Sequence, residues 1–120
     1  MHVLVLDDDL AFRRSLEREL GRLGHEPAAF GGWSSALDFL DEGKPADVIV
    51  TALEFKKDGP NGVSFALMAR RRRPSLKLLF IGPSADVADQ VDPGLGVVAL
   101  KEDGAEKIAS LVQTIAALEV

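Results

Sequence analysis

The stretch "LVLDDDLA", residues 4–11, decides the fold: an apolar run passes directly into three aspartates and then into a helical pattern. The apolar run, residues 2–6, has no polar alternation, which is typical of a strand buried on both faces of a parallel sheet. Asp9 stands where an N-cap is expected, so we predict a helix that begins near Leu10. A cap does not explain Asp7 and Asp8, because neighbouring carboxylates repel one another.

The alternation of apolar runs with amphipathic or turn-rich segments continues along the chain. Strands are predicted at residues 2–6, 27–30, 47–53, 76–81 and 96–100, with helices over 10–23, 34–43, 63–73 and 84–91 and a last helix carrying residues 108–118. Five strand–helix units without polar alternation predict an α/β fold with a five-stranded parallel sheet. For this length the expected topology is the doubly wound, flavodoxin-like one, as a single domain over residues 1–120.

Composition narrows the class of protein. The chain has 120 residues, of which 47% are hydrophobic and 28% charged, a net charge of −5 and a pI of about 5.0. This balance gives no reason to expect binding to nucleic acid or to an anionic membrane. There are no cysteines and no apolar run of membrane-span length, so a cytoplasmic setting is expected. The chain could be a complete protein or the first domain of a longer one.

Polar groups follow several predicted strands. Asp7 and Asp8 follow the first strand, residues 51–53 end the third, Gly82 follows the fourth and Lys101 the fifth. The carboxyl ends of parallel strands meet at one edge of a sheet, so these positions should converge. Two carboxylates suit Mg²⁺, and a lysine opposite them could pair with a phosphoryl oxygen. The arrangement therefore suits phosphoryl chemistry.

Three motifs carry a resemblance to a known family. "VLVLDDD" (3–9), "ADVIVTAL" (46–53) and "VVALK" (97–101), in the five-fold order above, resemble the receiver domain of two-component response regulators over about residues 2–118. The resemblance implies that Asp7 and Asp8 bind Mg²⁺. It also implies a phosphoacceptor aspartate at the end of the third strand, which a histidine kinase phosphorylates. A hydroxyl residue after the fourth strand and Lys101 would contact the phosphoryl group.

The sequence departs from that family pattern at four positions. The phosphoacceptor position falls on Ala52, the hydroxyl position on Gly82, the aromatic switch position on Val98, and the proline after the lysine is Glu102. Alanine has no oxygen with which to form an acyl phosphate. Either Ala52 is an engineered Asp→Ala change in an otherwise active receiver, or the chain is a natural pseudo-receiver. Because several positions depart together, the pseudo-receiver interpretation is favoured.

Without a third carboxylate, Mg²⁺ binding at Asp7 and Asp8 is expected to be weak. Glu54 could supply a further ligand, although a glutamate in a solvated loop is the simpler interpretation. Lys101 could instead form a salt bridge with Asp7 or Asp8, which would hold one conformation without phosphate.

Other candidate surfaces have simpler explanations. The basic run at residues 69–74 is expected at a helix C-terminus, where cations are favoured. Trp33 is expected to be a partly buried anchor, and His2 and His25 have no metal-ligand spacing. In receivers the fourth helix, fifth strand and fifth helix commonly form dimer contacts, and a dimer is possible here. Residues 83–94 are interrupted by prolines, so that face could be rebuilt.

Three functions remain open from the sequence. The first is a non-enzymatic pseudo-receiver that acts by protein–protein contact, with a histidine kinase or another two-component signalling protein as partner. The second is a conventional receiver whose phosphoacceptor has been replaced at Ala52. The third is a phosphatase resembling the haloacid-dehalogenase family, with Asp7 as nucleophile and Asp9 as general acid. Leu10 stands where that family usually has a small residue.

Overall fold

Strands and helices alternate through residues 1–118, the part of the chain that the computed structural model describes. Within that part no helix combines the length and apolar character needed to cross a membrane. The elements are β1 (His2–Leu6), α1 (Leu10–Arg22), β2 (Glu26–Phe30), α2 (Trp33–Asp41), β3 (Val48–Ala52), α3 (Gly62–Arg72), β4 (Lys77–Gly82), α4 (Ala85–Ala88), β5 (Val97–Leu100), a 3₁₀ turn (Lys101–Asp103) and α5 (Ala105–Ala117).

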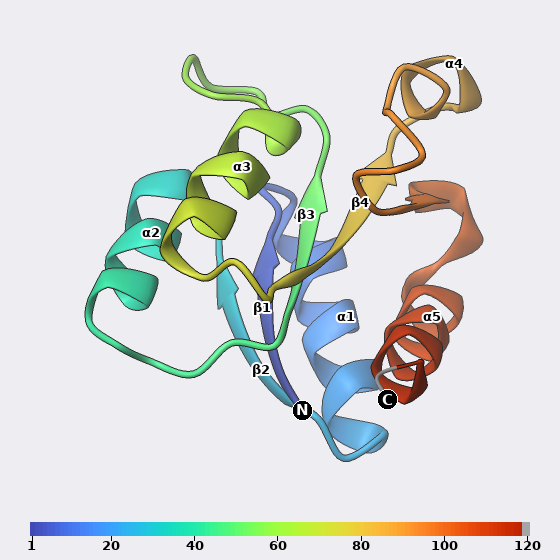
Figure 1. Ribbon diagram of the computed structural model, residues 1–120. Coiled ribbons are helices and arrows are strands. Elements are labelled where there is room, and N and C mark those ends of the chain that lie inside the picture. The colour runs from blue at the N-terminus through green and yellow to red at the C-terminus, as the bar shows by residue number, and fades with distance from the viewer. Residues whose placement is uncertain (119–120) are drawn as a thin grey trace.

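The strands form one parallel sheet in the order β2-β1-β3-β4-β5. Helices α2 and α3 cover one face of the sheet, and α1 and α5 cover the other (Figure 1). The order reverses between β1 and β3, and such a switch point leaves a crevice at the carboxyl ends of the strands. The predicted doubly wound, flavodoxin-like fold is confirmed.

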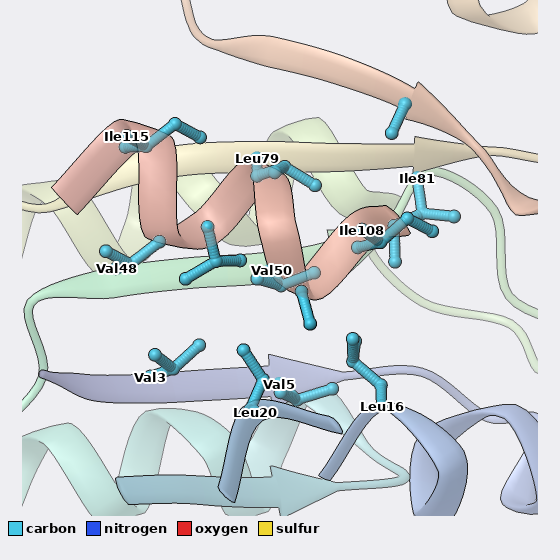
Figure 2. Close-up of a cluster of buried hydrophobic side chains, with 13 residues drawn as sticks. Val3, Val5, Leu16, Leu20, Val48, Val50, Leu79, Ile81, Ile108 and Ile115 are labelled. Atoms are coloured by element: carbon cyan, nitrogen blue, oxygen red, sulfur yellow. The ribbon is translucent and has the colours of Figure 1, made fainter. Parts of the chain in front are cut away.

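Alternate residues of each strand supply two separate cores, because successive side chains of a strand point to opposite faces. Val3 and Val5 of β1 pack with α1 and α5, as Figure 2 shows, whereas Leu4 and Leu6 pack with α2 and α3. All four side chains are buried. A strand buried on both faces needs no polar positions, which explains the unbroken apolar run in the sequence.

The ends of α2 and α3 differ from the sequence prediction. Helix α2 begins at Trp33 with Gly32 as its N-cap, one residue before the predicted start at residue 34. Helix α3 begins at Gly62, where the side chain of Asn61 accepts a hydrogen bond from the backbone N–H of Ser64. Glycine and asparagine are both common N-cap residues, and neither changes the spacing of the apolar residues that follow in the helix. Sequence periodicity therefore places such a start one residue late.

The last two helices also differ from the sequence prediction at their ends. Helix α4 is a single turn, Ala85–Ala88, instead of residues 84–91, and Ser84 caps it. Helix α5 ends at Ala117 with Leu118 as its C-cap. The predicted domain boundary at residue 120 lies outside the described residues.

The arginine run at the end of α3 is largely structural. Arg70 donates to the carbonyl oxygens of Leu76 and Leu95. Arg73 donates to the carbonyl oxygens of Leu40, in the last turn of α2, and of Lys44, in the α2–β3 connection. Arg72 forms an ion pair with Asp41 at 2.6 Å. These contacts hold chain connections at the amino-terminal edge of the sheet, opposite the predicted site.

We expect Arg73→Gln to lower the free energy of unfolding by about 1–2 kcal/mol, because two carbonyl oxygens lose a charged donor at 2.8 Å each. The matched control is Arg71→Gln, an exposed position with no hydrogen bond or ion pair among the described residues. That variant should change stability by less than about 0.5 kcal/mol. Equal urea midpoints for the two variants would contradict this assignment.

Candidate functional site

A small cavity of about 60 Å³ lies where the carboxyl ends of the strands meet. The residues that line it are Asp7, Asp8, Ala52, Glu54, Ile81, Pro83 and Lys101. Five of the predicted site residues are therefore brought together, from three strand ends far apart in the sequence. Gly82 and Val98 do not line this cavity.

Asp7 is the buried member of the acidic pair, with 1% of its surface exposed. Its Oδ1 accepts a hydrogen bond from the backbone N–H of Asp9 at 2.9 Å. The Oδ2 atom is buried without a hydrogen-bond partner among the described residues. Burial raises the pKa of the Asp7 carboxyl, and the Asp9 N–H and the Lys101 ammonium oppose that rise.

The carbonyl oxygen of Asp7 is also held in place. Arg13, one turn along α1, donates a hydrogen bond from Nη1 to that oxygen at 2.7 Å. A Cβ on Gly31 would lie 2.8 Å from the same Nη1, so the absence of a side chain there leaves room for the guanidinium. The sequence analysis did not identify Arg13, because an arginine on a helical pattern reads as an ordinary surface residue.

Asp8 is partly buried and is engaged by the loop between β3 and α3. Its Oδ2 accepts a hydrogen bond from the backbone N–H of Lys56 at 2.7 Å. This contact ties the loop, which extends beyond the end of β3 in Figure 1, to the acidic pair. One oxygen of each predicted metal ligand thus already accepts a backbone hydrogen bond.

Lys101 reaches across from the end of β5 to the aspartates that follow β1. Its Nζ lies 3.0 Å from Asp9 Oδ2 and 3.6 Å from Asp7 Oδ1, and 4.9 Å from the centre of the Phe12 ring. The predicted salt bridge with Asp7 is confirmed, whereas Asp8 forms no ion pair with Lys101. The closer partner is Asp9, which was predicted as a helix cap and, in the phosphatase alternative, as a general acid, but not as a partner of Lys101.

Asp9 performs both roles with different oxygens. Its Oδ1 accepts the backbone N–H of Phe12 at 3.1 Å, as an N-cap does, and its Oδ2 faces Lys101. The hydrogen bonds from Lys101 and from Phe12 hold the pKa of the Asp9 carboxyl below its usual value. The third aspartate of "DDD" was the only sequence signal that could have identified this role.

We expect Lys101→Met to raise the pKa of Asp7 further and to move the pKa of Asp9 upward, toward its usual value, because a neighbouring cation favours both carboxylates. A lowered carboxyl pKa contributes stability that is present above the usual pKa and is lost as the pH falls. Through Asp9, the parent chain should therefore be more stable than Lys101→Met at neutral pH, and this contribution should be lost in acid.

Carboxyl carbon NMR across a pH titration measures both pKa values. Lys107→Met is the matched control, because its pair with Asp103 is 3.9 Å long, and the Lys107 side chain is 68% exposed. Unchanged pKa values of Asp7 and Asp9 in the Lys101 variant would refute the bridge.

The positions predicted for the phosphoryl contact and the switch are filled differently. Gly82 is buried, and a Cβ there would lie 3.3 Å from the Cβ of Ala88, a close contact, and 3.4 Å from Leu53 Cδ1, an ordinary one. The hydroxyl of Ser84 caps α4 instead of lining the cavity. Val98 is partly buried and packs against the α2–α3 core.

The donor set fits a divalent cation only in part. The unpartnered Asp7 Oδ2 and the free Asp8 oxygen are hard oxygen ligands of the kind Mg²⁺ takes. Ala52 adds no oxygen, and Lys101 places a competing cation 3.6 Å from Asp7. Glu54 is exposed at the rim of the cavity. Across residues 1–118 no cluster of three or more His, Cys, Asp or Glu residues is arranged to hold a metal ion.

Known proteins resemble this chain over part of its sequence and in its fold. No protein-family model matches the chain. Over 77 residues, 64% of the chain, it is 32% identical to the DNA-binding transcriptional regulator NtrC of Azospirillum brasilense, of which it spans 15%. The chain thus spans only a small part of the curated relative that it matches.

Solved structures match almost the entire chain. A response regulator receiver protein from Sinorhizobium medicae is 22% identical with a TM-score of 0.83, and the match covers 98% of this chain and 95% of that one. Response regulator protein TrrA from Thermotoga maritima, solved in complex with Mg²⁺ and BeF, is 18% identical with a TM-score of 0.79, over 94% and 96% of the two chains. The resemblance to receiver domains is thereby confirmed for the fold.

Proposed function

We propose that this chain, which has the fold of response regulator receiver domains, is a two-component signalling module that works without phosphorylation of its own residue 52. It acts as an interaction module in the cytoplasm and not as an enzyme. Its partner would be a histidine kinase or another protein of such a pathway, and its Mg²⁺ site would be weak.

One observation carries this proposal. Where the family pattern has the phosphoacceptor and the lysine that contacts the phosphoryl group, this chain has the methyl group of Ala52 and an ion-paired Lys101. Ala52 presents no oxygen to the cavity, and Lys101 is already paired with Asp9 and Asp7. A lysine ion-paired to carboxylates stabilises an incoming phosphoryl group less, because its charge is partly compensated. The ammonium group of the site is therefore already paired in the absence of phosphate.

Two further contacts support the same interpretation. The Lys56 N–H occupies one oxygen of Asp8, and any side chain at position 82 would need Ala88 to shift by a few tenths of an ångström. A single engineered Asp→Ala change at Ala52 would account for neither feature. The phosphatase alternative finds no support either, since both oxygens of Asp9 are engaged by the helix cap and by Lys101.

Intact mass after incubation with Mg²⁺ and a small acyl phosphate donor tests the proposal. We expect no phosphoryl adduct on the unaltered chain, and none on Ala52→Asp under the same conditions. An adduct on the unaltered chain, mapped to Asp7, Asp8 or Glu54, would overturn the proposal. An adduct on Ala52→Asp alone would make residue 52 the single obstacle and favour the engineered alternative.

A further inference from the structure

A second, larger cleft of about 350 Å³ adjoins the acidic cavity, with which it shares Asp8. It lies between the start of α2 and the loop that follows β3. The residues that line it are Asp8, Gly31, Gly32, Trp33, Ser34, Ser35, Phe55, Lys56, Lys57, Asp58 and Pro60. Its volume is within the range of small-molecule sites, and the function proposed above does not use it.

We propose that this cleft binds a mononucleotide, a ligand with one aromatic ring system, a sugar and a single phosphate. The inference rests on the proposed function in one respect: a receiver without a phosphoacceptor needs another input, and this cleft would provide it.

The aromatic lining suits a flat ring. Trp33 contributes to the cleft from the start of α2, and Phe55 contributes from the loop that follows β3. The Trp33 side chain was expected to be a partly buried anchor, and the structure leaves it 39% exposed. Its indole Nε1 would lie 3.0 Å from a Cβ on Gly59, so the loop backbone packs against it. Aromatic side chains of this kind stack on bases without selecting a sequence.

The basic groups suit a phosphate. Lys56 and Lys57 are exposed, and neither forms an ion pair with a carboxylate in the described part of the chain. Ser34 and Ser35 add hydroxyl donors in the first turn of α2, whose N-cap residue provides no side-chain acceptor. Two free ammonium groups beside hydroxyl donors give one phosphate several charge-assisted hydrogen bonds.

The acidic groups limit the charge of the ligand. Asp8 and Asp58 line the same cleft, and they would repel a ligand that carries several phosphates. Carboxylates accept hydrogen bonds from ribose hydroxyls, as in dinucleotide sites. The three parts of a mononucleotide match the three kinds of group in the lining: the base matches the aromatic residues, the sugar hydroxyls match the carboxylates, and the single phosphate matches the lysines and serines.

Ligand binding in this cleft would affect the acidic cavity through a single hydrogen bond. Lys56 is one of the residues that line the cleft, and its backbone N–H donates a hydrogen bond to Asp8 Oδ2 at 2.7 Å. A ligand that displaced the loop would lengthen that hydrogen bond and free an oxygen of Asp8. The backbone amide NMR signal of Lys56 should therefore shift when the ligand binds.

Trp33 is the only tryptophan in the chain, so its fluorescence reports on this cleft directly. We would titrate the whole chain with AMP, inorganic phosphate and adenosine, and measure the same samples by calorimetry. We expect saturable binding of AMP, and binding of phosphate or adenosine that is weaker by about tenfold or more. Phosphate that binds as tightly as AMP would overturn the nucleotide assignment, and so would adenosine that does.

Charge-removing variants locate the phosphate. Lys56→Gln and Lys57→Gln should each weaken AMP binding by about tenfold, the usual loss for one charge-assisted hydrogen bond. Lys44→Gln, at an exposed lysine outside the cleft, is the matched control and should bind AMP unchanged. The proposal fails if AMP does not bind, or if all three variants bind it like the parent. The phosphorylation assay is independent of these results, so the two proposals can fail separately.

Discussion

Replacement of Gly62 by alanine is expected to lower the free energy of unfolding by about 3 kcal/mol or more. Gly62 begins α3, and its backbone N–H donates to the carbonyl oxygen of Leu53 at 2.9 Å. A Cβ at this position would overlap the carbonyl oxygen of Ala52 and lie 2.9 Å from the Cα of Leu53. Both obstacles are backbone atoms at the end of a fully buried strand, so neither can rotate away.

Urea unfolding of Gly62→Ala measures this loss. Gly21→Ala is the matched control: Gly21 lies within α1, and a Cβ there would meet no atom within 4 Å. Alanine is the better helix former, so that control should gain up to about 1 kcal/mol. Similar midpoints for the two variants would show that the close approach of α3 to the end of β3 is not required.

Ala52→Asp is expected to lower the free energy of unfolding by about 2 kcal/mol in EDTA, because it adds a further carboxylate to a cavity that Asp7, Asp8 and Glu54 already line. Ala52 is 7% exposed, so water would screen the new charge poorly. Mg²⁺ should restore the loss, since a third oxygen ligand improves the site and binding stabilises the folded state. At one hundred times its dissociation constant, a ligand adds about 2.7 kcal/mol.

Ala52→Asn is the control for this prediction, because it adds a side chain of nearly the same shape without the charge. Its stability should respond to Mg²⁺ no more than that of the parent chain. Urea unfolding of both variants with EDTA and with saturating Mg²⁺ makes the comparison. An equal response of the two variants would refute the predicted gain of a metal ligand.

Much of this site could be predicted from the sequence because its members follow strands. The carboxyl ends of parallel strands lie at one edge of the sheet, so the positions of Asp7, Asp8 and Lys101 in the sequence are enough to predict that they meet. The same register identified Ala52 as the residue in place of the phosphoacceptor. The contacts of Asp9 could not be predicted, since a capping aspartate and an ion-paired one look alike in sequence.

The sequence by itself determined the fold and the edge of the sheet where the site lies. Buried strands without polar alternation and helices with one apolar face leave few packing solutions, so pattern alone was sufficient. Only the tertiary structure decided which polar groups pair: Lys101 with Asp9, and the Lys56 amide with Asp8. Those pairs depend on side-chain reach and loop path over a few ångströms, and no periodicity in the sequence encodes such distances.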